Sequence, residues 1–179
     1  MYAETERLLI RDFVPDDWRA VHAFLSDPHL TKHTSFHKRT EQDTKQFVDE
    51  CVFHNNQVPR FAHNCAIVLR STRELVGWIG FGHPDEKGIA DRSFGYALHR
   101  DHWNRGYMTE SLTAMLRFCF VDLGVESVFA EHREQNPASG RVMDKAGMRY
   151  VGTFPSPSEP GIVERRFIAH RNEWLAAHT

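Results

Sequence analysis

The sequence RSFGYALHRDHWNRGYMTESLTAMLRFCFVDL, residues 92–123, decides the predicted fold. It begins with a short run of strand character over residues 93–98 and continues through a polar turn at residues 103–108. After the turn, apolar residues recur at helical spacing and form one stripe: Met108, Leu112, Met115, Leu116, Cys119 and Phe120. Gly124 follows this stripe and is a typical helix stop. The stretch therefore predicts a strand, a tight turn and a long amphipathic helix.

The turn before this helix is suited to binding phosphate. The first N–H groups of a helix have no intrahelical partner, and the helix dipole adds partial positive charge at the same end. Gly106 leaves the backbone open to an anion, and Arg105 adds a cation. A strand, a turn with one glycine and a helix also occur without any ligand, and the turn alone favours that ordinary interpretation. The rest of the chain changes the balance.

Length and composition narrow the class of protein. The chain has 179 residues, of which 41% are hydrophobic and 26% charged, as is usual for one globular domain. Its formal charge of −2 and the lack of a Lys/Arg block argue against nucleic acid or a membrane as a partner. The start lacks a signal-peptide core, and the three cysteines form no Cys-x-x-Cys pair. We therefore expect a cytoplasmic protein.

The remaining patterns predict alternating strands and helices in a single mixed α/β domain over residues 1–179. A helix should begin near Pro15, another after the capping-box sequence that starts at Thr40, and a third after Asn136. Two loops are also expected, at residues 30–39 and at the proline-rich residues 154–161. The predicted strands are residues 6–13, 61–69, 74–81, 93–98, 127–131, 148–153 and 162–171.

A second motif links the chain to a known family. Asn136-Pro137-Ala138-Ser139, with Val142, Lys145 and Gly147, follows the strand after the phosphate-ready helix. Together with the turn at residues 103–108, this order resembles the GNAT superfamily of N-acetyltransferases. It is most similar to the branch that includes the ribosomal-protein N-terminal acetyltransferases. The similarity extends from Thr5 to Trp174. It implies the α/β (α+β) GNAT fold, in which a mixed, mostly antiparallel sheet splays between its fourth and fifth strands and carries helices on both faces.

The resemblance also implies a substrate pair and a set of binding residues. Acetyl-coenzyme A (acetyl-CoA) would be the donor, and the acceptor would be a primary amine on a protein N-terminus or a small molecule. The implied cofactor-binding residues are Tyr96, Ala97 and Leu98 for the pantetheine arm, the turn Trp103, Asn104, Arg105, Gly106, Tyr107 and Met108 for the diphosphate, and Asn136 and Ser139 for the sulfur end. Two residues depart from the family pattern: Trp103 stands in place of Gln or Arg, and Met108 stands in place of a small residue. Met108 can still offer its N–H, but its side chain must point into the core.

The chemistry requires a proton donor for the departing thiolate and an oxyanion donor, which a strand N–H can supply. Ser139 is the candidate proton donor, although it could equally serve only to cap its helix. Many relatives use a tyrosine seven residues after the asparagine, but this chain has Met143 there.

An amine with a pKa of about 10 must also lose a proton before it attacks. Many relatives carry a glutamate for this purpose where this chain has Ser93. The candidate bases are Asp91, His83, His132 and Glu131, each of which is more often a solvated surface residue; His132 is favoured because it follows the strand beside the cofactor. For Glu110, one turn into the phosphate helix, we predict a structural role.

Three histidines spaced by four, His29, His33 and His37, invite a metal interpretation. Turn signals around them predict a loop instead, so we expect no metal. That loop should flank the acceptor pocket, which makes His33, Phe36 and His37 candidate substrate-binding residues, although exposed loop residues with one buried Phe36 are the commoner case. The glycine pattern at residues 77–82 resembles a dinucleotide loop, but no helix follows it and we reject that interpretation.

Two other functions remain open at this stage. A non-catalytic acyl-CoA-binding sensor or assembly subunit would explain the missing glutamate at Ser93 and the missing tyrosine at Met143. A general α/β interaction domain would need no coenzyme A at all. The sequence also leaves a homodimer open.

Overall fold

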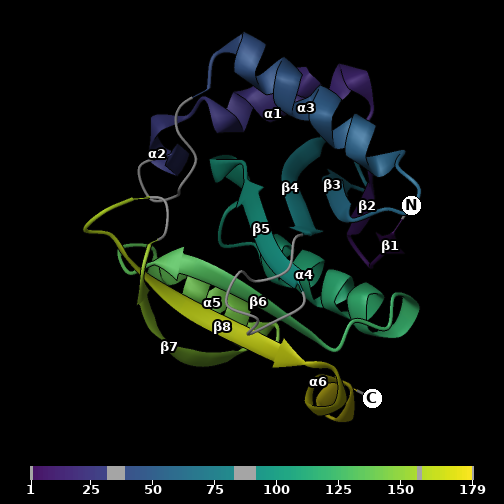
Figure 1. The fold of residues 1–179 in the computed structure, drawn as a ribbon. Helices are drawn as coiled ribbons and strands as arrows, with labels where there is room; N and C mark the ends of the chain where they lie inside the picture. Colours follow the sequence, from purple (N-terminus) through teal and green to yellow (C-terminus); the bar gives the residue numbers. More distant parts are fainter. Residues whose placement is uncertain (1, 32–38, 83–91, 157–158, 179) are drawn as a thin grey trace.

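The computed structural model describes residues 2–31, 39–82, 92–156 and 159–178. Its eight strands form one sheet in the order β1-β2-β3-β4-β5-β6-β8-β7, in which only β5 and β6 pair in parallel (Figure 1). The strands are β1 (Ala3–Glu4), β2 (Leu8–Asp12), β3 (Ala62–Leu69), β4 (Leu75–Gly82), β5 (Arg92–Leu98), β6 (Ser127–Arg133), β7 (Arg149–Pro155) and β8 (Val163–His170). The predicted mixed, mostly antiparallel sheet is confirmed.

Helices cover both faces of the sheet, as the sequence predicted (Figure 1). On one face lie α1 (Trp18–Leu25), α2 (Pro28–Thr31) and α3 (Glu41–Asn55), and on the other lie α4 (Tyr107–Arg117), α5 (Pro137–Lys145) and α6 (Arg171–His178). Short 3₁₀ turns precede α1 and α4 at Pro15–Asp17 and Arg100–His102, and α4 continues into a π-helical segment, Phe118–Asp122. Among the described residues, no helix is long and apolar enough to cross a bilayer.

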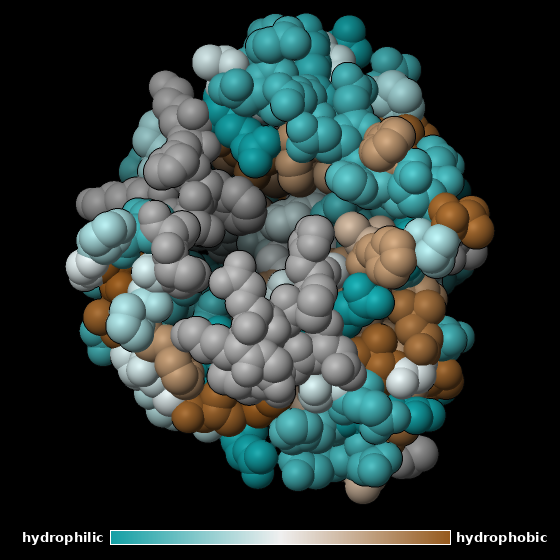
Figure 2. Space-filling model, viewed as in Figure 1, coloured by the Kyte–Doolittle hydropathy of each residue, from teal (hydrophilic) through white to brown (hydrophobic). Residues whose placement is uncertain are grey.

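Alternation along the strands produces two cores, one on each face. On β3, Cys65 and Ile67 pack with α4, whereas Ala66 and Val68 pack with α1 and α3. The predicted stripe of α4 is buried in the first core, with every member at most 7% exposed, and Met108 does point inward. The outer surface of α3 is mostly hydrophilic (Figure 2), with Phe53 as an exposed apolar residue. The apolar stripes predicted from the sequence are therefore the buried faces of these helices.

Local signals placed most helix ends correctly. Thr40 forms the predicted capping box with Asp43, and Asn136 and Pro137 begin α5. Two loop predictions were wrong at their ends, because Leu30 belongs to the short helix α2 and Phe154 extends β7. The two short terminal elements β1 and α6 were missed. Strand β1 has two residues, and Trp174 is the one buried residue of α6, so neither element has a readable apolar periodicity.

The glycine pattern of residues 77–82 lies on β4 rather than in a phosphate loop. A Cβ added to Gly77 would lie 2.6 Å from the carbonyl oxygen of Ala97, and one added to Gly82 would lie 2.9 Å from the backbone of residues 61 and 62. Close strand packing explains these glycines without a dinucleotide.

Candidate functional site

The sheet opens between β5 and β6. Strand β5 pairs with β4 along its length, from Ser93 to Leu98, but pairing with β6 ends at Phe94 opposite Ala130. Beyond that point β6 continues beside β8 through residues 131–133, and its end diverges from Leu98. Strands β5 and β6 are the fourth and fifth of the predicted strands, so the predicted position of the splay is confirmed.

A cavity of about 770 Å³ lies along this opening. Its walls come from β5, the turn before α4, the end of β6 and the start of α5, with two residues of α2 at one edge. The predicted cofactor-binding residues that line it are Tyr96, Ala97, Leu98, Trp103, Asn104, Gly106, Tyr107, Met108, Asn136 and Ser139. Arg105 is exposed and does not line it. Ten residues that are dispersed in the sequence thus lie around one space.

The turn before α4 has the backbone shape that an anion site needs. Asn104 and Gly106 have positive φ values of 59° and 80°, and Gly106 is the residue before the first helical turn. Left-handed residues next to a helix start allow successive N–H groups to converge. Trp103, one of the departures from the family pattern, ties the turn to β5 because its indole Nε1 donates to the Leu98 carbonyl at 2.7 Å.

At the far end of the opening, two hydroxyl groups meet. The Tyr96 hydroxyl of β5 lies 2.8 Å from Ser139 Oγ and 3.2 Å from the Ser139 carbonyl oxygen, so its one proton can be donated to either oxygen. Asn136 caps α5 by accepting from the Ser139 N–H at 3.4 Å, which fixes the position of the serine. Burial raises the pKa of Tyr96, so its hydroxyl stays protonated at neutral pH. Sequence reasoning assigned Tyr96 through its backbone and missed this contact.

His132 lies beside the same opening, on the face of β6 that packs against α5. It is 8% exposed, and its Nδ1 donates to the Arg133 carbonyl at 2.8 Å. Because a carbonyl oxygen only accepts, the proton of the neutral ring is on Nδ1 and Nε2 carries the lone pair. Burial lowers the pKa of His132, so the ring is neutral at pH 7 and can accept a proton.

Two carboxyl groups line the cavity on the opposite face of β6 and β8. Glu131 accepts from Arg166 Nε at 2.8 Å, and Glu164 accepts from Ser156 Oγ at 2.9 Å. Burial, and then the negative charge of Glu131, raise the pKa of Glu164 against the hydrogen bond from Ser156. Glu164 was missed, because only the register of β6 and β8 brings it beside Glu131.

The arrangement matches known proteins over most of its length. The sequence matches the acetyltransferase (GNAT) domain family over residues 7–149. The chain belongs to the GNAT acetyltransferase family. An uncharacterised N-acetyltransferase of Bacillus subtilis, YnaD, is 31% identical over 176 residues, which are 97% of this chain and 92% of YnaD. A GNAT acetyltransferase of Bacillus anthracis has a TM-score of 0.84 and 30% identity, over 97% of this chain and all of that one.

The fold is also shared with RimL, a ribosomal L7/L12 protein N-acetyltransferase solved with coenzyme A. Its TM-score is 0.80 over 96% of this chain and 98% of RimL, and its identity is 15%, which supports the fold alone. The predicted membership of the GNAT family is thus confirmed, and a ribosomal-protein acetyltransferase is among its structural neighbours. GNAT enzymes transfer an acetyl group from acetyl-CoA, and the cavity beside β5 has the elements to hold such a donor.

The two positions where this chain lacks a catalytic side chain of many GNAT enzymes have structural explanations. Ser93 takes the place of the usual glutamate, and its hydroxyl donates to the Gly82 carbonyl on β4 at 3.0 Å. Met143 takes the place of the usual tyrosine and is 1% exposed in the core. Tyr96 brings a hydroxyl to Ser139 from the opposite wall.

The remaining predicted residues divide into two groups. Glu110 has the expected structural role, since Thr5 and Arg7 donate hydrogen bonds to its carboxylate. The candidate substrate-binding residues His33, Phe36 and His37 and the candidate bases His83 and Asp91 lie outside the described residues. Within the part of the chain that the structure describes, no three His, Cys, Asp or Glu side chains gather as a metal site.

Proposed function

We propose that this GNAT acetyltransferase uses acetyl-CoA to acetylate a primary amine in the opening between β5 and β6. One observation supports this most strongly. The open edge of β5 runs between the N-terminus of α4 and the Tyr96–Ser139 hydroxyl pair, and all three line one cavity. An elongated molecule with a diphosphate at one end and a reactive thioester at the other suits that order of features.

Each wall of the cavity has a separate task in this proposal. The N–H groups at the start of α4, from the turn Arg105–Met108, bind the diphosphate. Of the three β5 residues predicted for the pantetheine arm, Tyr96 and Leu98 direct backbone groups to the unpaired edge, as an added strand would receive them. The Ala97 carbonyl oxygen instead lies beside Gly77 of β4. Asn136 holds Ser139 at the sulfur end by capping α5. The donor is thereby fixed before the amine arrives, which lowers the entropic part of the barrier.

Ser139 and Tyr96 are the proposed acid pair. The amine nitrogen bonds to the thioester carbon, the carbon–sulfur bond breaks, and the departing thiolate takes the proton of Ser139 Oγ. Tyr96 can donate in turn to Ser139 because the two oxygens are 2.8 Å apart. Tyr96 is then left without its proton, so solvent must return one proton to the pair, and the base must release the proton of the amine, before the next cycle.

The amine must be neutral when it attacks, and two described side chains could take its proton. His132 has a free lone pair on Nε2 and a neutral ring, whereas Glu131 lies on the face of the sheet that also carries α2. We assign the base to His132, acting directly or through water, and keep Glu131 as the alternative. His33, Phe36 and His37 stay proposed acceptor residues, and the cytoplasmic location and the homodimer also stay predictions.

A non-catalytic acyl-CoA-binding subunit is the alternative function. The serine at position 93 and the methionine at position 143 favour it, because both remove a group that many GNAT enzymes use. The hydroxyl pair at Tyr96 and Ser139 favours catalysis instead, since a binding subunit needs no buried proton donor at the sulfur end.

Release of free thiol from acetyl-CoA with a panel of amines separates the two functions. The panel should contain peptides with free N-termini, polyamines, amino acids and amino sugars. We expect turnover with at least one amine, and Ser139→Ala should lower kcat about tenfold or more without weakening acetyl-CoA binding. Tyr96→Phe should lower kcat by a smaller factor. Coenzyme A binding without thiol release on any amine would establish the alternative.

A further inference from the structure

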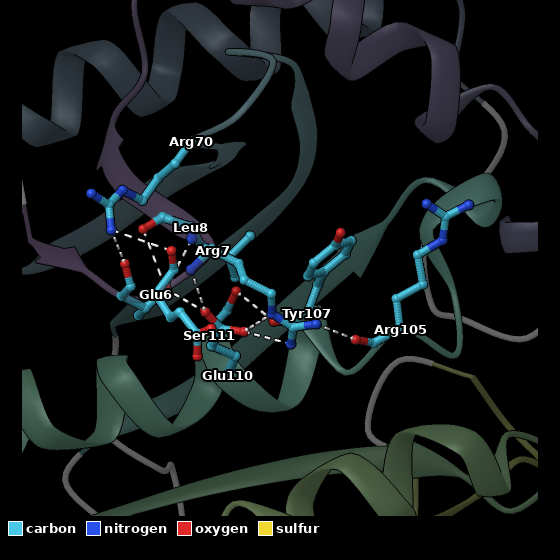
Figure 3. Close-up of polar contacts among 9 residues, drawn as sticks. Glu6, Arg7, Leu8, Arg70, Arg105, Tyr107, Glu110 and Ser111 are labelled. Carbon is cyan, nitrogen blue, oxygen red and sulfur yellow. Dashed lines mark hydrogen bonds and ion pairs between the residues drawn. The ribbon is translucent and has the colours of Figure 1, made fainter.

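Arg7 joins the N-terminal segment to the start of the phosphate helix. Its Nε donates to Glu110 Oε2 at 2.7 Å, and its Nη2 lies 2.6 Å from the same oxygen (Figure 3). Its Nη1 donates to the carbonyl oxygen of Arg105 at 2.9 Å. One guanidinium group therefore holds both the turn before α4 and the first turn of α4, which are 98 and 103 residues away in the sequence.

The turn that Arg7 holds has an unfavourable backbone. Arg105 lies between Asn104 and Gly106, which both have left-handed φ values. Glycine adopts such values at no steric cost, and asparagine does so more readily than most other residues but still at a cost that contacts of the turn must offset. Arg7 also lies over the Tyr107 ring at 4.7 Å, and its Nη2 would be 3.3 Å from a Cβ added to Gly106. The side of the turn that faces away from the cavity is thus packed against this side chain.

Charge gives Arg7 a second effect on the same site. Glu110 is in the first turn of α4, where an unpaired carboxylate would repel a bound diphosphate. Burial opposes ionisation of Glu110, but the hydrogen bonds from Thr5 and Arg7 prevail and lower its pKa, so the group is charged at neutral pH. Arg7 supplies the compensating positive charge from the outer side of the helix.

We propose that Arg7 is a positioning residue for acetyl-CoA: it fixes the Trp103–Gly106 turn so that the N–H groups of α4 converge on the diphosphate, and it offsets the charge of Glu110. The proposal rests on the proposed function, since it assumes that the diphosphate binds at this turn. Arg7 does not line the cavity, so its effect on the ligand is transmitted through the turn.

Arg70 provides a matched control on the same segment. Its Nη1 donates to the carbonyl oxygens of Thr5 and Glu6 at 2.7 and 3.2 Å, and its Nη2 pairs with Glu4 at 2.7 Å. Its side chain is 45% exposed, close to the 43% of Arg7. Figure 3 shows Arg70 reaching the segment from the side away from Arg105. It therefore shares the structural task of Arg7 without contact to the turn.

The test compares Arg7→Gln with Arg70→Gln in the full-length protein. We measure the Kd for coenzyme A, the kcat and KM with acetyl-CoA, and kcat/KM with S-acetylpantetheine, which lacks the diphosphate. Arg7→Gln should raise the Kd for coenzyme A and the KM for acetyl-CoA about tenfold, while kcat at saturation and kcat/KM for S-acetylpantetheine stay unchanged. Arg70→Gln should lower Tm as much as Arg7→Gln does and leave the Kd unchanged.

Two further variants separate position from charge. Glu110→Gln in the Arg7→Gln background should restore part of the lost affinity for coenzyme A. Arg7→Lys keeps the positive charge, so it should retain more affinity than Arg7→Gln. It also takes the place of Arg7→Gln in the test if that variant folds poorly. An unchanged Kd for coenzyme A in Arg7→Gln would overturn the proposal while the proposed function stands. A fall in kcat/KM for S-acetylpantetheine as large as that for acetyl-CoA would do the same. A wild-type protein that binds no coenzyme A would overturn both.

Discussion

The two edges of β5 have opposite properties, although one strand carries both. On the β4 edge, pairing extends from Ser93 to Leu98, and Gly77 lies so close that a Cβ would meet the Ala97 carbonyl oxygen at 2.6 Å. On the β6 edge, pairing ends at Phe94, and the rest of the strand borders a cavity of about 770 Å³. The first edge has no room for one methyl group, whereas the second leaves backbone groups available to a ligand.

The difference shows how a sheet can hold a ligand without losing its own stability. Unpaired strand edges are costly and prone to aggregation, so a protein keeps them only where something covers them. Here the closed edge and the two cores stabilise β5, and the open edge is available to bind. Substitutions on the closed edge should therefore lower the stability of the fold, and substitutions around the open edge should weaken ligand binding.

The largest expected effect is on the closed edge. Gly77→Val places a branched side chain against the Ala97 carbonyl oxygen and should lower the free energy of unfolding by about 3 kcal/mol. Urea denaturation followed by circular dichroism measures this loss. Gly161→Ala is the control, because among the described residues no atom apart from its chain neighbours lies within 4 Å of the new Cβ, so the backbone cost of its φ of 84° is the main expected loss. Equal losses in the two variants would show that the closed edge is not tightly packed.

Gly106→Val tests the open edge by changing its anion site. The side chain would strain a φ of 80° and approach the Arg7 guanidinium, so the N–H groups of α4 would no longer converge. We expect about a hundredfold loss of affinity for coenzyme A, which equals about 2.7 kcal/mol, and a smaller loss of stability. Titration calorimetry gives the affinity. Gly124→Val, a left-handed glycine beyond the other end of the helix, should lose stability alone.

Two buried histidines sharpen the comparison further. His63 lies on the closed side, stacked on Phe81 at 4.6 Å, and burial, followed by the charges of Arg60 and Arg92, lowers its pKa to about 4. The unfolded chain, with a histidine pKa of about 6.5, binds more protons between these values, so stability should fall as the pH falls through this window. His63→Phe should remove about 1 kcal/mol of the stability difference between pH 7 and pH 5.5.

Denaturation curves at the two pH values check this expectation, and the pH profile of turnover is the control. His63→Phe should leave that profile unchanged, because His63 is outside the cavity. His132 lies on the open side, and His132→Gln should instead shift the acidic limb of the pH profile of turnover. An altered turnover profile in His63→Phe would mean that the two sides are coupled.

Local features of the fold could be predicted from the sequence, and contacts between distant elements could not. The stripe of α4, the Thr40 capping box and the start of α5 depend on neighbours within a few residues, so propensity and spacing determine them. The splay was predicted only through the resemblance to a family. Its physical origin, the divergence of β6 toward β8, is a property of the whole sheet.

The site shows the same division. The predicted turn and the Asn136–Ser139 motif do border one cavity. Each could be predicted because it depends on neighbouring residues, one as a helix start suited to an anion and the other as a helix cap. The contacts Tyr96–Ser139 and Arg7–Arg105 join residues 43 and 98 positions apart, and no spacing rule relates them. Glu110 is intermediate: its place in the helix predicted a structural role, but its partners were visible only in the folded chain.

Amide chemical shifts recorded while coenzyme A is added test the central claim most directly. If the open edge of β5 and the start of α4 receive the ligand, the amides of residues 95–98 and 105–108 shift together with one Kd, while those of β3 and the closed edge of β4 barely move. Shifts confined to other parts of the surface, with residues 105–108 unaffected at saturation, would contradict the account.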